Sequence, residues 1–205
     1  MIEFKNVSYN YFTKFYSLFK FSYTFDTGNY ALIGDYIDGN LSIIRLLSKL
    51  DKLYKGDIFI NGKNLKKINL KKDINIAYLS KNPIFFENKT VMQNLIYPLK
   101  SRGLKKDAYT SKCEQAIENF GWKDKANLKV TSLSQPEKLI LSLIRASVRN
   151  LDILLCEDIF DIVNFDLLQK VPATTTILAL NNSHSPETFT KLYIKLGCLD
   201  KSIPD

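Results

Sequence analysis

A loop bounded by Gly34 and Gly39 has the residue types and the position of an anion-binding site. An apolar run over residues 30–33 precedes it and predicts a buried strand. After the loop, apolar residues recur at helical spacing, at Ile43, Leu46, Leu47 and Leu50. A strand that leads through such a loop into a helix presents backbone N–H groups to an anion. The same pattern is also that of a plain strand-to-helix turn.

A metal centre is not expected. Three cysteines lie far apart without CxxC spacing, and His184 is the one histidine. Structural zinc sites use closely spaced thiolates and imidazoles. Cysteines without a pairing pattern also favour a reduced, cytosolic setting.

The composition is that of an ordinary globular chain. Of its 205 residues 45% are hydrophobic and 24% charged, which excludes a disordered or collagenous protein. No apolar run approaches the roughly 18–20 residues that span a bilayer. The residues after Met1 lack the apolar region of a signal peptide, so neither a membrane span nor a leader is expected.

The net charge of +8 comes almost entirely from lysine, because only four residues are arginine. Proteins that read nucleic acid tend to use the arginine fork. The charge therefore permits an anionic partner without requiring one, and it disfavours nucleic acid.

Strand patterns alternate with helical ones along the chain. Alternating or continuous apolar residues predict strands at 2–11, 21–25, 30–33, 55–62, 74–79, 151–156, 175–180 and 191–196. The strand at 55–62 ends in an Asn-Gly turn. Residues 90–149 are mainly helical in pattern, with helices around 116–120 and 137–148. This order predicts an α/β protein with a helical insert.

A series of segments, in the right order and at the right spacing, resembles the nucleotide-binding domain of ABC (ATP-binding-cassette) transporters over nearly the whole chain. They read MIEFKNVSYNYF, YKGDIFINGKNLKKI, INIAYLSKNPIFFENKTVMQNL and LSQPEKLILSLIRASVRNLDILLCEDIF. The resemblance implies an ABC-type P-loop fold, with a mixed central sheet, an antiparallel N-terminal subdomain and a helical subdomain. It implies one domain over 1–205, with a core at about 1–88 and 151–205 and a helical subdomain at about 89–150.

The phosphate loop of that family, G-x-x-G-x-G-K-S/T-S/T, aligns with residues 34–42. The retained positions are Gly34, Gly39 and Ser42, the replaced ones are Ile37, Asn40 and Leu41, and Asp38 adds a carboxylate. Asn40 in place of lysine removes a charge-assisted phosphate contact of about 1.5–3 kcal/mol. At about 4 Å and an effective dielectric near 20, Asp38 adds repulsion of about 4 kcal/mol. Because a micromolar site supplies about 8 kcal/mol in all, the resemblance implies ATP and Mg²⁺ as cofactors, but these departures predict weak binding or none.

The catalytic positions that the resemblance implies are also altered. Where the family has a metal-binding aspartate and then a catalytic glutamate, this chain has Glu157 and then Asp158. A shift of about 1 Å at such a position can cost about 100-fold in rate. Lys81 stands at the position of the Q-loop glutamine, where it could instead neutralise Asp38.

The signature sequence LSGGQ of the family becomes LSQPE over residues 133–137. Ser134 at the N-cap, Pro136 in the first turn and Glu137 at the capping-box position predict a well-formed helix start. The bulk and negative charge that replace the glycines oppose contact with a phosphate.

Two further positions remain open. The family's switch histidine aligns with Asn181, or with His184 if the register shifts by three residues. Tyr11 matches the aromatic residue that stacks on adenine, and it could equally be a packing residue.

A partner surface is implied by the segment that follows the Q-loop position. In the family this segment lines a groove that receives a short helix of the membrane permease. The matching residues here are Pro83, Ile84, Phe85, Phe86 and Tyr97. Exposed aromatic residues in a groove are frequent interface hot spots, although these side chains could equally fill a junction inside the protein.

The sequence therefore predicts a degenerate, non-hydrolysing ATP-binding-like subunit, peripheral at the cytoplasmic face of a membrane. Its expected partners are a permease subunit, a second ABC ATPase subunit, or both, in a homo- or heterodimer. The alternative is a weak ATPase that contributes to a heterodimer powering membrane transport. A second alternative is a basic adaptor on a membrane surface or nucleic acid. Its membrane-facing residues would be Phe12, Phe15, Tyr16 and Phe19, with Lys14 and Lys20.

Overall fold

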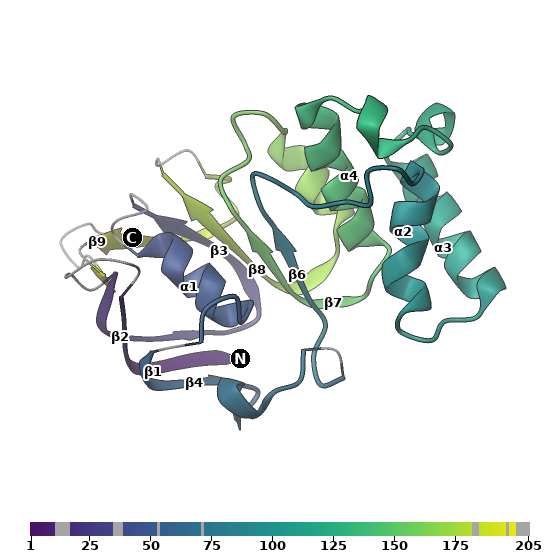
Figure 1. Cartoon of the computed structure of the whole chain (residues 1–205). Helices are drawn as coiled ribbons and strands as arrows, with labels where there is room; N and C mark the ends of the chain where they lie inside the picture. Colours follow the sequence, from purple (N-terminus) through teal and green to yellow (C-terminus); the bar gives the residue numbers. More distant parts are fainter. Residues whose placement is uncertain are drawn as a thin grey trace. The chain divides into compact units, whose positions relative to one another are not determined.

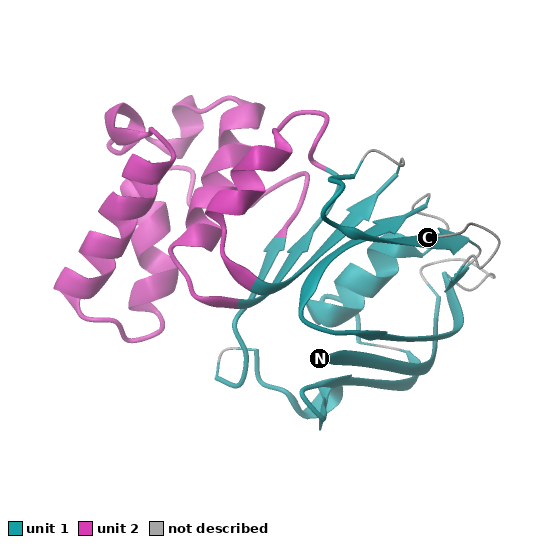
Figure 2. Ribbon diagram, turned by 180° about the vertical axis from the view of Figure 1, so that it is seen from behind, with its two compact units in different colours: residues 1–78, 152–158, 174–205 teal, residues 79–151, 159–173 magenta. Residues whose placement is uncertain are grey.

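The computed structural model describes residues 1–10, 17–34, 39–52, 54–70, 72–181, 185–195 and 197–199 (Figure 1). The chain divides into a first unit of residues 1–78, 152–158 and 174–205 and a second unit of residues 79–151 and 159–173 (Figure 2). The second unit begins earlier than the expected boundary near residue 88 and also takes in residues 159–173. One reason is that Phe85 is buried in the hydrophobic cluster of the helices.

An antiparallel sheet of four strands, in the order β2-β1-β4-β5, forms one part of the first unit. Its strands are β1 (Ile2–Tyr9), β2 (Leu18–Phe25), β4 (Lys55–Ile60) and β5 (Lys63–Asn64), and the short 3-10 helix η2 (Leu65–Lys67) follows. Ile2 lies opposite Phe25 on one neighbour and Ile60 on the other. The predicted Asn-Gly turn joins β4 and β5, with φ of 49° at Asn61 and 76° at Gly62. The antiparallel N-terminal part of the prediction is thus confirmed.

A mixed sheet of six strands, in the order β10-β9-β3-β8-β7-β6, forms the other part. Its strands are β3 (Gly28–Ile33), β6 (Ile76–Leu79), β7 (Leu151–Cys156), β8 (Ala173–Leu180), β9 (Thr190–Lys195) and β10 (Cys198–Leu199). β3 pairs in parallel with both β8 and β9, whereas β10 is antiparallel to β9. The near-continuous apolar runs predicted as buried strands are β7 and β8, as expected for central strands of an α/β sheet. The α/β class and the mixed central sheet are confirmed.

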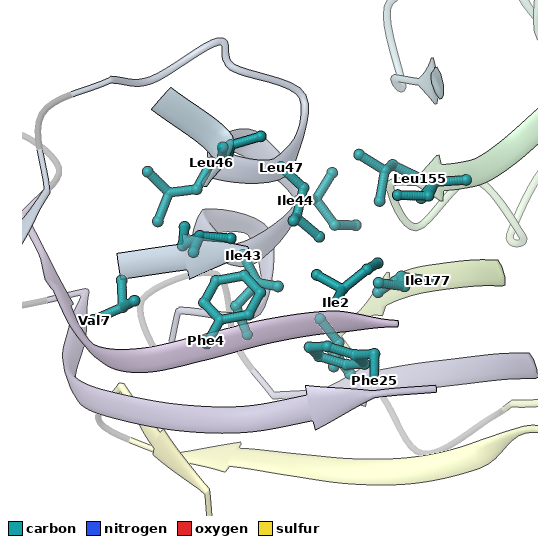
Figure 3. Packing of buried hydrophobic residues seen from close by; sticks show 14 of the residues in the cluster. Ile2, Phe4, Val7, Phe25, Ile43, Ile44, Leu46, Leu47, Leu155 and Ile177 are labelled. Carbon is teal, nitrogen blue, oxygen red and sulfur yellow. The ribbon is translucent and has the colours of Figure 1, made fainter. Parts of the chain in front are cut away.

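The helix α1 (Asn40–Leu47) completes the hydrophobic core of the first unit. Ile43 and Leu47 share one buried cluster with Phe4 of the first sheet and with Leu155 and Ile177 of the second (Figure 3). The predicted helical stripe is therefore correct for its first three members.

The prediction is wrong for the fourth member of that stripe, Leu50, which is not a core residue. The helix ends at Leu47, and Lys49 adopts a left-handed backbone with φ of 56°. Leu50 lies beyond this turn and is 52% exposed.

The second unit is built on α2 (Val91–Lys100), α3 (Lys106–Asn119) and α4 (Gln135–Ser147). The 3-10 helices η3 (Lys123–Lys125) and η4 (Val130–Ser132) lie between α3 and α4, and a third, η5 (Phe165–Lys170), lies between β7 and β8. Leu95, Trp122 and Leu141 are buried together in its separate core. The predicted helical middle of the chain is confirmed. No helix in the described ranges is both long enough and apolar enough to cross a membrane.

Candidate functional site

Gly39 stands immediately before α1, where backbone contact leaves no room for a side chain. Its φ is +99°, and a Cβ built on it would lie 2.0 Å from the backbone oxygen of Ser17. The Gly39 carbonyl accepts a hydrogen bond from the Ile43 N–H at 3.2 Å. A glycine is therefore required here by packing alone, whatever the loop binds. Asp38 lies outside the described residues, so its proposed repulsion of a phosphate stays a prediction.

Asn40, at the position of the family's phosphate-binding lysine, is fully buried and bonded to backbone. Its Nδ2 donates to the carbonyl oxygens of Gly34 at 2.5 Å and Leu180 at 3.0 Å, and its Oδ1 accepts from the Leu41 N–H at 2.6 Å. The Leu180 oxygen also accepts from the Gly34 N–H at 3.1 Å. The amide thus ties the start of α1 to the ends of β3 and β8. Ser42, the retained hydroxyl, is buried on α1 with 5% of its surface exposed.

The two carboxylates after β7 are each held by a neighbour within the first unit. Asp158 is 5% exposed and accepts the Asn181 N–H at 3.0 Å. Glu157 accepts a hydrogen bond from the hydroxyl of Tyr78 on β6. Burial, and then the hydrogen bond with Glu157, raise the pKa of Tyr78, which keeps this hydroxyl a donor. The structure therefore places the Asp158 carboxylate against the Asn181 backbone, while the roles of Glu157, Asp158 and Asn181 stay predictions.

In the second unit, Lys81 and the signature segment lie together. The Gln135 Nε2 donates to the Lys81 carbonyl oxygen at 2.9 Å. The Glu137 Oε2 accepts both the N–H and the hydroxyl of Ser134 at 2.8 Å, which confirms the predicted capping box. Hydrogen bonds from Lys125 and then from Ser134 lower the pKa of Glu137 to about 2. Glu137 is therefore charged at neutral pH, and its carboxylate lies against Ser134.

Several predicted residues cannot be placed. Tyr11 and His184 lie outside the described residues, so their roles stay predictions. The same holds for four residues of the aromatic membrane-binding hypothesis, Phe12, Lys14, Phe15 and Tyr16. Of that group, Phe19 on β2 is 45% exposed, and the Lys20 Nζ lies 5.5 Å from the centre of its ring.

Among the residues that the structure does describe, no three His, Cys, Asp or Glu side chains could together hold a metal ion.

Exposed apolar side chains lie on the segment that precedes α2 and on α2 itself. We call Ile84, Phe86 and Tyr97 the aromatic patch. These residues are 87%, 51% and 57% exposed, and the Phe86 and Tyr97 ring centres are 4.6 Å apart. Pro83 beside them is half-buried. Phe85 was predicted to belong to this surface, but it is 8% exposed and packs into the helical core.

Two residues that sequence reasoning missed hold the aromatic patch in place. Asn94 is buried, and its side chain bonds both the N–H and the carbonyl of Phe86, at 2.9 and 3.1 Å. The Arg145 guanidinium lies 4.3 Å from the Phe85 ring centre and donates to the Ile84 carbonyl at 2.7 Å. Burial lowers the pKa of Arg145. A basic residue within the apolar pattern of α4 was the one signal that could have revealed this role.

Comparison with known proteins agrees with this geometry. A family model described as "ABC transporter" matches residues 20–160. The methionine import ATP-binding protein MetN 3 of Oceanobacillus iheyensis is 30% identical over 166 residues, which cover 77% of this chain and 49% of the relative. The phosphate import ATP-binding protein PstB of Saccharolobus solfataricus is 25% identical over 182 residues, covering 80% of this chain and 70% of PstB. The chain thus spans about half the length of the methionine-import relatives that it matches.

Solved structures resemble the fold over almost the whole chain. The dimeric ATP-binding cassette MJ0796, bound to ADP and Pi, superposes with a TM-score of 0.84 over 98% of this chain and 97% of that one, at 16% identity. CbiO1 from Clostridium perfringens, part of the transporter complex cbiONQ, has a TM-score of 0.79 over 97% and 86% of the two chains, also at 16% identity. At this identity the likeness shows the fold alone.

Proposed function

The chain belongs to the ABC transporter family, and we propose that it is an ATP-binding-subunit-like member that does not hydrolyse ATP. It acts by assembling with a membrane permease or with a second ATP-binding subunit. The observation that carries this proposal is the state of Asn40, whose buried amide makes three hydrogen bonds to backbone atoms, two from its Nδ2 and one to its Oδ1. The side chain at the position of the phosphate-contacting lysine is bonded instead to the backbone of Gly34 and Leu180.

The residues of this site do not fit ATP with Mg²⁺. The loop lacks the lysine that would contact the phosphates, and Leu41 replaces the hydroxyl that would bind the metal. Glu157 and Asp158 already accept hydrogen bonds within the first unit. In a dimer of the family's type the signature helix faces the partner's nucleotide, and there the charged Glu137 opposes a phosphate by like-charge repulsion. These residues therefore support no step of ATP hydrolysis.

The aromatic patch supports the assembly part of the proposal. Monomeric proteins do expose single apolar side chains, but paired aromatic rings on a fixed backbone are typical of an interface anchor. Asn94 and Arg145 fix that backbone, so the rings lose little further freedom when a partner binds. We propose that this patch receives a helix of a membrane permease, which would hold the chain at the cytoplasmic face of the membrane.

Calorimetric titration with ATP, with and without Mg²⁺, tests the loss of hydrolysis. We expect no Mg²⁺-dependent heat and no release of phosphate, because Glu157 and Asp158 already accept hydrogen bonds and the lysine is absent. The variant Asp158→Asn keeps the acceptor for the Asn181 N–H. Phosphate release that disappears in Asp158→Asn would instead establish the weak-ATPase alternative.

Substitution of the aromatic patch tests assembly. We expect Phe86→Ser/Tyr97→Ser to reduce at least tenfold the amount of chain that sediments with membranes of the native host, since two hot-spot residues carry about 1–2 kcal/mol each or more. The free energy of unfolding of this double variant should change by less than about 0.5 kcal/mol per site, because both side chains are more than half exposed. The matched control is Ile162→Ser, which removes another 54%-exposed apolar residue of the second unit. If Phe86→Ser/Tyr97→Ser and Ile162→Ser sedimented with membranes to the same extent, whether both bound or neither did, the role of the patch would be contradicted.

A further inference from the structure

Two adjoining pockets open in the first unit. The smaller has a volume of about 280 Å³ and lies among the end of α1, the loop after it and η2. The larger, of about 620 Å³, extends to the ends of β1 and β4. Lys52, Tyr54 and Lys66 line both pockets, so the two can take one ligand. Pockets that hold small organic molecules have about 300–1,000 Å³, which is the size range of this pair.

The described lining carries an excess of positive charge. Four lysines contribute to it: Lys49, Lys52, Lys55 and Lys66. Lys49 is engaged, since its Nζ donates to the Ile68 carbonyl at 2.7 Å. Lys66 makes only a long hydrogen bond, of 3.4 Å, to the Gly56 carbonyl. Lys52, Lys55 and Lys66 form no ion pair with any described carboxylate, and all three are exposed. An anion that enters would therefore meet three ammonium groups that form no ion pair with a described carboxylate.

The acidic residues nearby do not cancel this charge. Asp51 lines the smaller pocket, but the Arg45 guanidinium holds it at 2.6 and 3.3 Å. Burial raises the pKa of Asp51, but the hydrogen bonds from Arg45 and Tyr9 outweigh it and lower the pKa overall. Asp57, whose charge acts on Tyr54, accepts a hydrogen bond from the neutral Asn64 amide at 2.9 Å, so it offsets part of the lysine charge, but it lines neither pocket.

The pockets also offer an apolar wall and a buried donor. Leu46 and Leu65 line the smaller pocket, and the Tyr54 ring lies 4.7 Å from the Lys66 Nζ. The Tyr54 Oη is buried and has no hydrogen-bond partner among the described residues. Burial, and then the charge of Asp57, raise the pKa of Tyr54, so it remains a donor at neutral pH. A buried donor without a partner is rare in native proteins, and a ligand oxygen would satisfy it.

We propose that these two pockets form a binding site for a small organic phosphate. Lys52 and Lys66 contact the phosphate, the Tyr54 hydroxyl donates to an oxygen of the ligand, and its apolar or aromatic part lies against Leu46 and Leu65. A phosphate dianion matches several lysines better than a single carboxylate does, because lysine acts as a point charge without a fixed fork. Among the lining residues that the structure describes, none belongs to residues 34–42.

Titration with phenyl phosphate tests the site, with inorganic phosphate and phenol as partial ligands. We expect phenyl phosphate to bind more tightly than either part, with an affinity that falls as salt is raised. Lys52→Gln/Lys66→Gln should weaken its binding at least tenfold. The matched control Lys67→Gln removes a neighbouring exposed lysine that lines neither pocket, and it should change the affinity less than twofold. Tyr54→Phe should weaken binding severalfold without loss of the folded state.

Other results would overturn the proposal. They are the absence of binding, equal weakening by Lys67→Gln, or phenyl phosphate binding no better than inorganic phosphate. Vesicles separate the two sources of such a ligand. Binding to phosphatidic acid but not phosphatidylcholine vesicles, lost in Lys52→Gln/Lys66→Gln, assigns a lipid headgroup, whereas phenyl phosphate binding without vesicle binding assigns a soluble metabolite. ATP heat that is lost in Lys52→Gln/Lys66→Gln belongs to these pockets, and heat that survives belongs to the phosphate loop and contradicts the proposed function instead.

Discussion

Gly39→Ala is expected to lower the free energy of unfolding by more than about 3 kcal/mol. The added Cβ would lie 2.0 Å from the Ser17 backbone oxygen and 2.9 Å from the Leu18 Cδ2. A side-chain rotation cannot relieve a clash with a backbone atom, so α1 or the start of β2 must move. The φ of +99° adds about 1 kcal/mol of conformational strain for any residue with a Cβ. Urea unfolding followed by circular dichroism measures the loss.

The control for this prediction is Gly62→Ala. Gly62 also has a positive φ, of +76°, but a Cβ there would meet no atom within 4 Å. It should therefore lose only about 1 kcal/mol, the conformational part of the effect. If the two variants were equally stable, the contact with Ser17 would not constrain Gly39. The expected difference means that packing, independently of any nucleotide, is sufficient reason for a glycine at this end of the loop.

Much of the fold could be predicted because its signals are local. The alternation of apolar residues in β1, the apolar runs of β7 and β8, and the Asn61-Gly62 turn depend on residues close together in the chain. The capping box of Ser134 and Glu137 is likewise a three-residue pattern. The end of α1 was missed because Lys49 adopts a left-handed conformation that nothing in its residue type announces.

The candidate site was less predictable because its contacts join distant segments. The hydrogen bond of Asn40 to the Leu180 carbonyl spans 140 residues, and that of Tyr78 to Glu157 spans 79. Alignment with a family can place Asn40 and Glu157, but it cannot say which neighbours use their polar atoms. Phe85 was assigned to the wrong surface for the same reason, since it packs in a cluster with residues such as Leu141 and Ile144, more than 50 positions further along the chain. The pockets around Tyr54 also combine segments that no local pattern connects.

Asn40→Ala is expected to lower the free energy of unfolding by about 3 kcal/mol or more. The substitution removes three hydrogen bonds inside a buried site. The Leu41 N–H loses its acceptor, and the Gly34 and Leu180 carbonyls each lose a donor. Each unsatisfied buried group costs about 1–3 kcal/mol, although Leu180 keeps its bond from the Gly34 N–H. Asn29→Ala is the matched control, because Asn29 is exposed on β3, and its loss should stay within about 0.5 kcal/mol.

Asn40→Lys tests whether the lysine alone would restore ATP binding. Restoring the family's lysine removes the amide that joins β3 to β8 and places an ammonium group in a position that is 0% exposed. We therefore expect this variant to be at least as unstable as Asn40→Ala and to gain no Mg²⁺-dependent ATP binding in the same calorimetric titration. A variant that kept its stability and bound ATP would contradict this expectation. It would show that the absence of the lysine alone prevents ATP binding, and that the fold does not need the hydrogen bonds of Asn40. The expected result means instead that one substitution cannot restore the site, because the residues around Asn40 now depend on its amide for their hydrogen bonds.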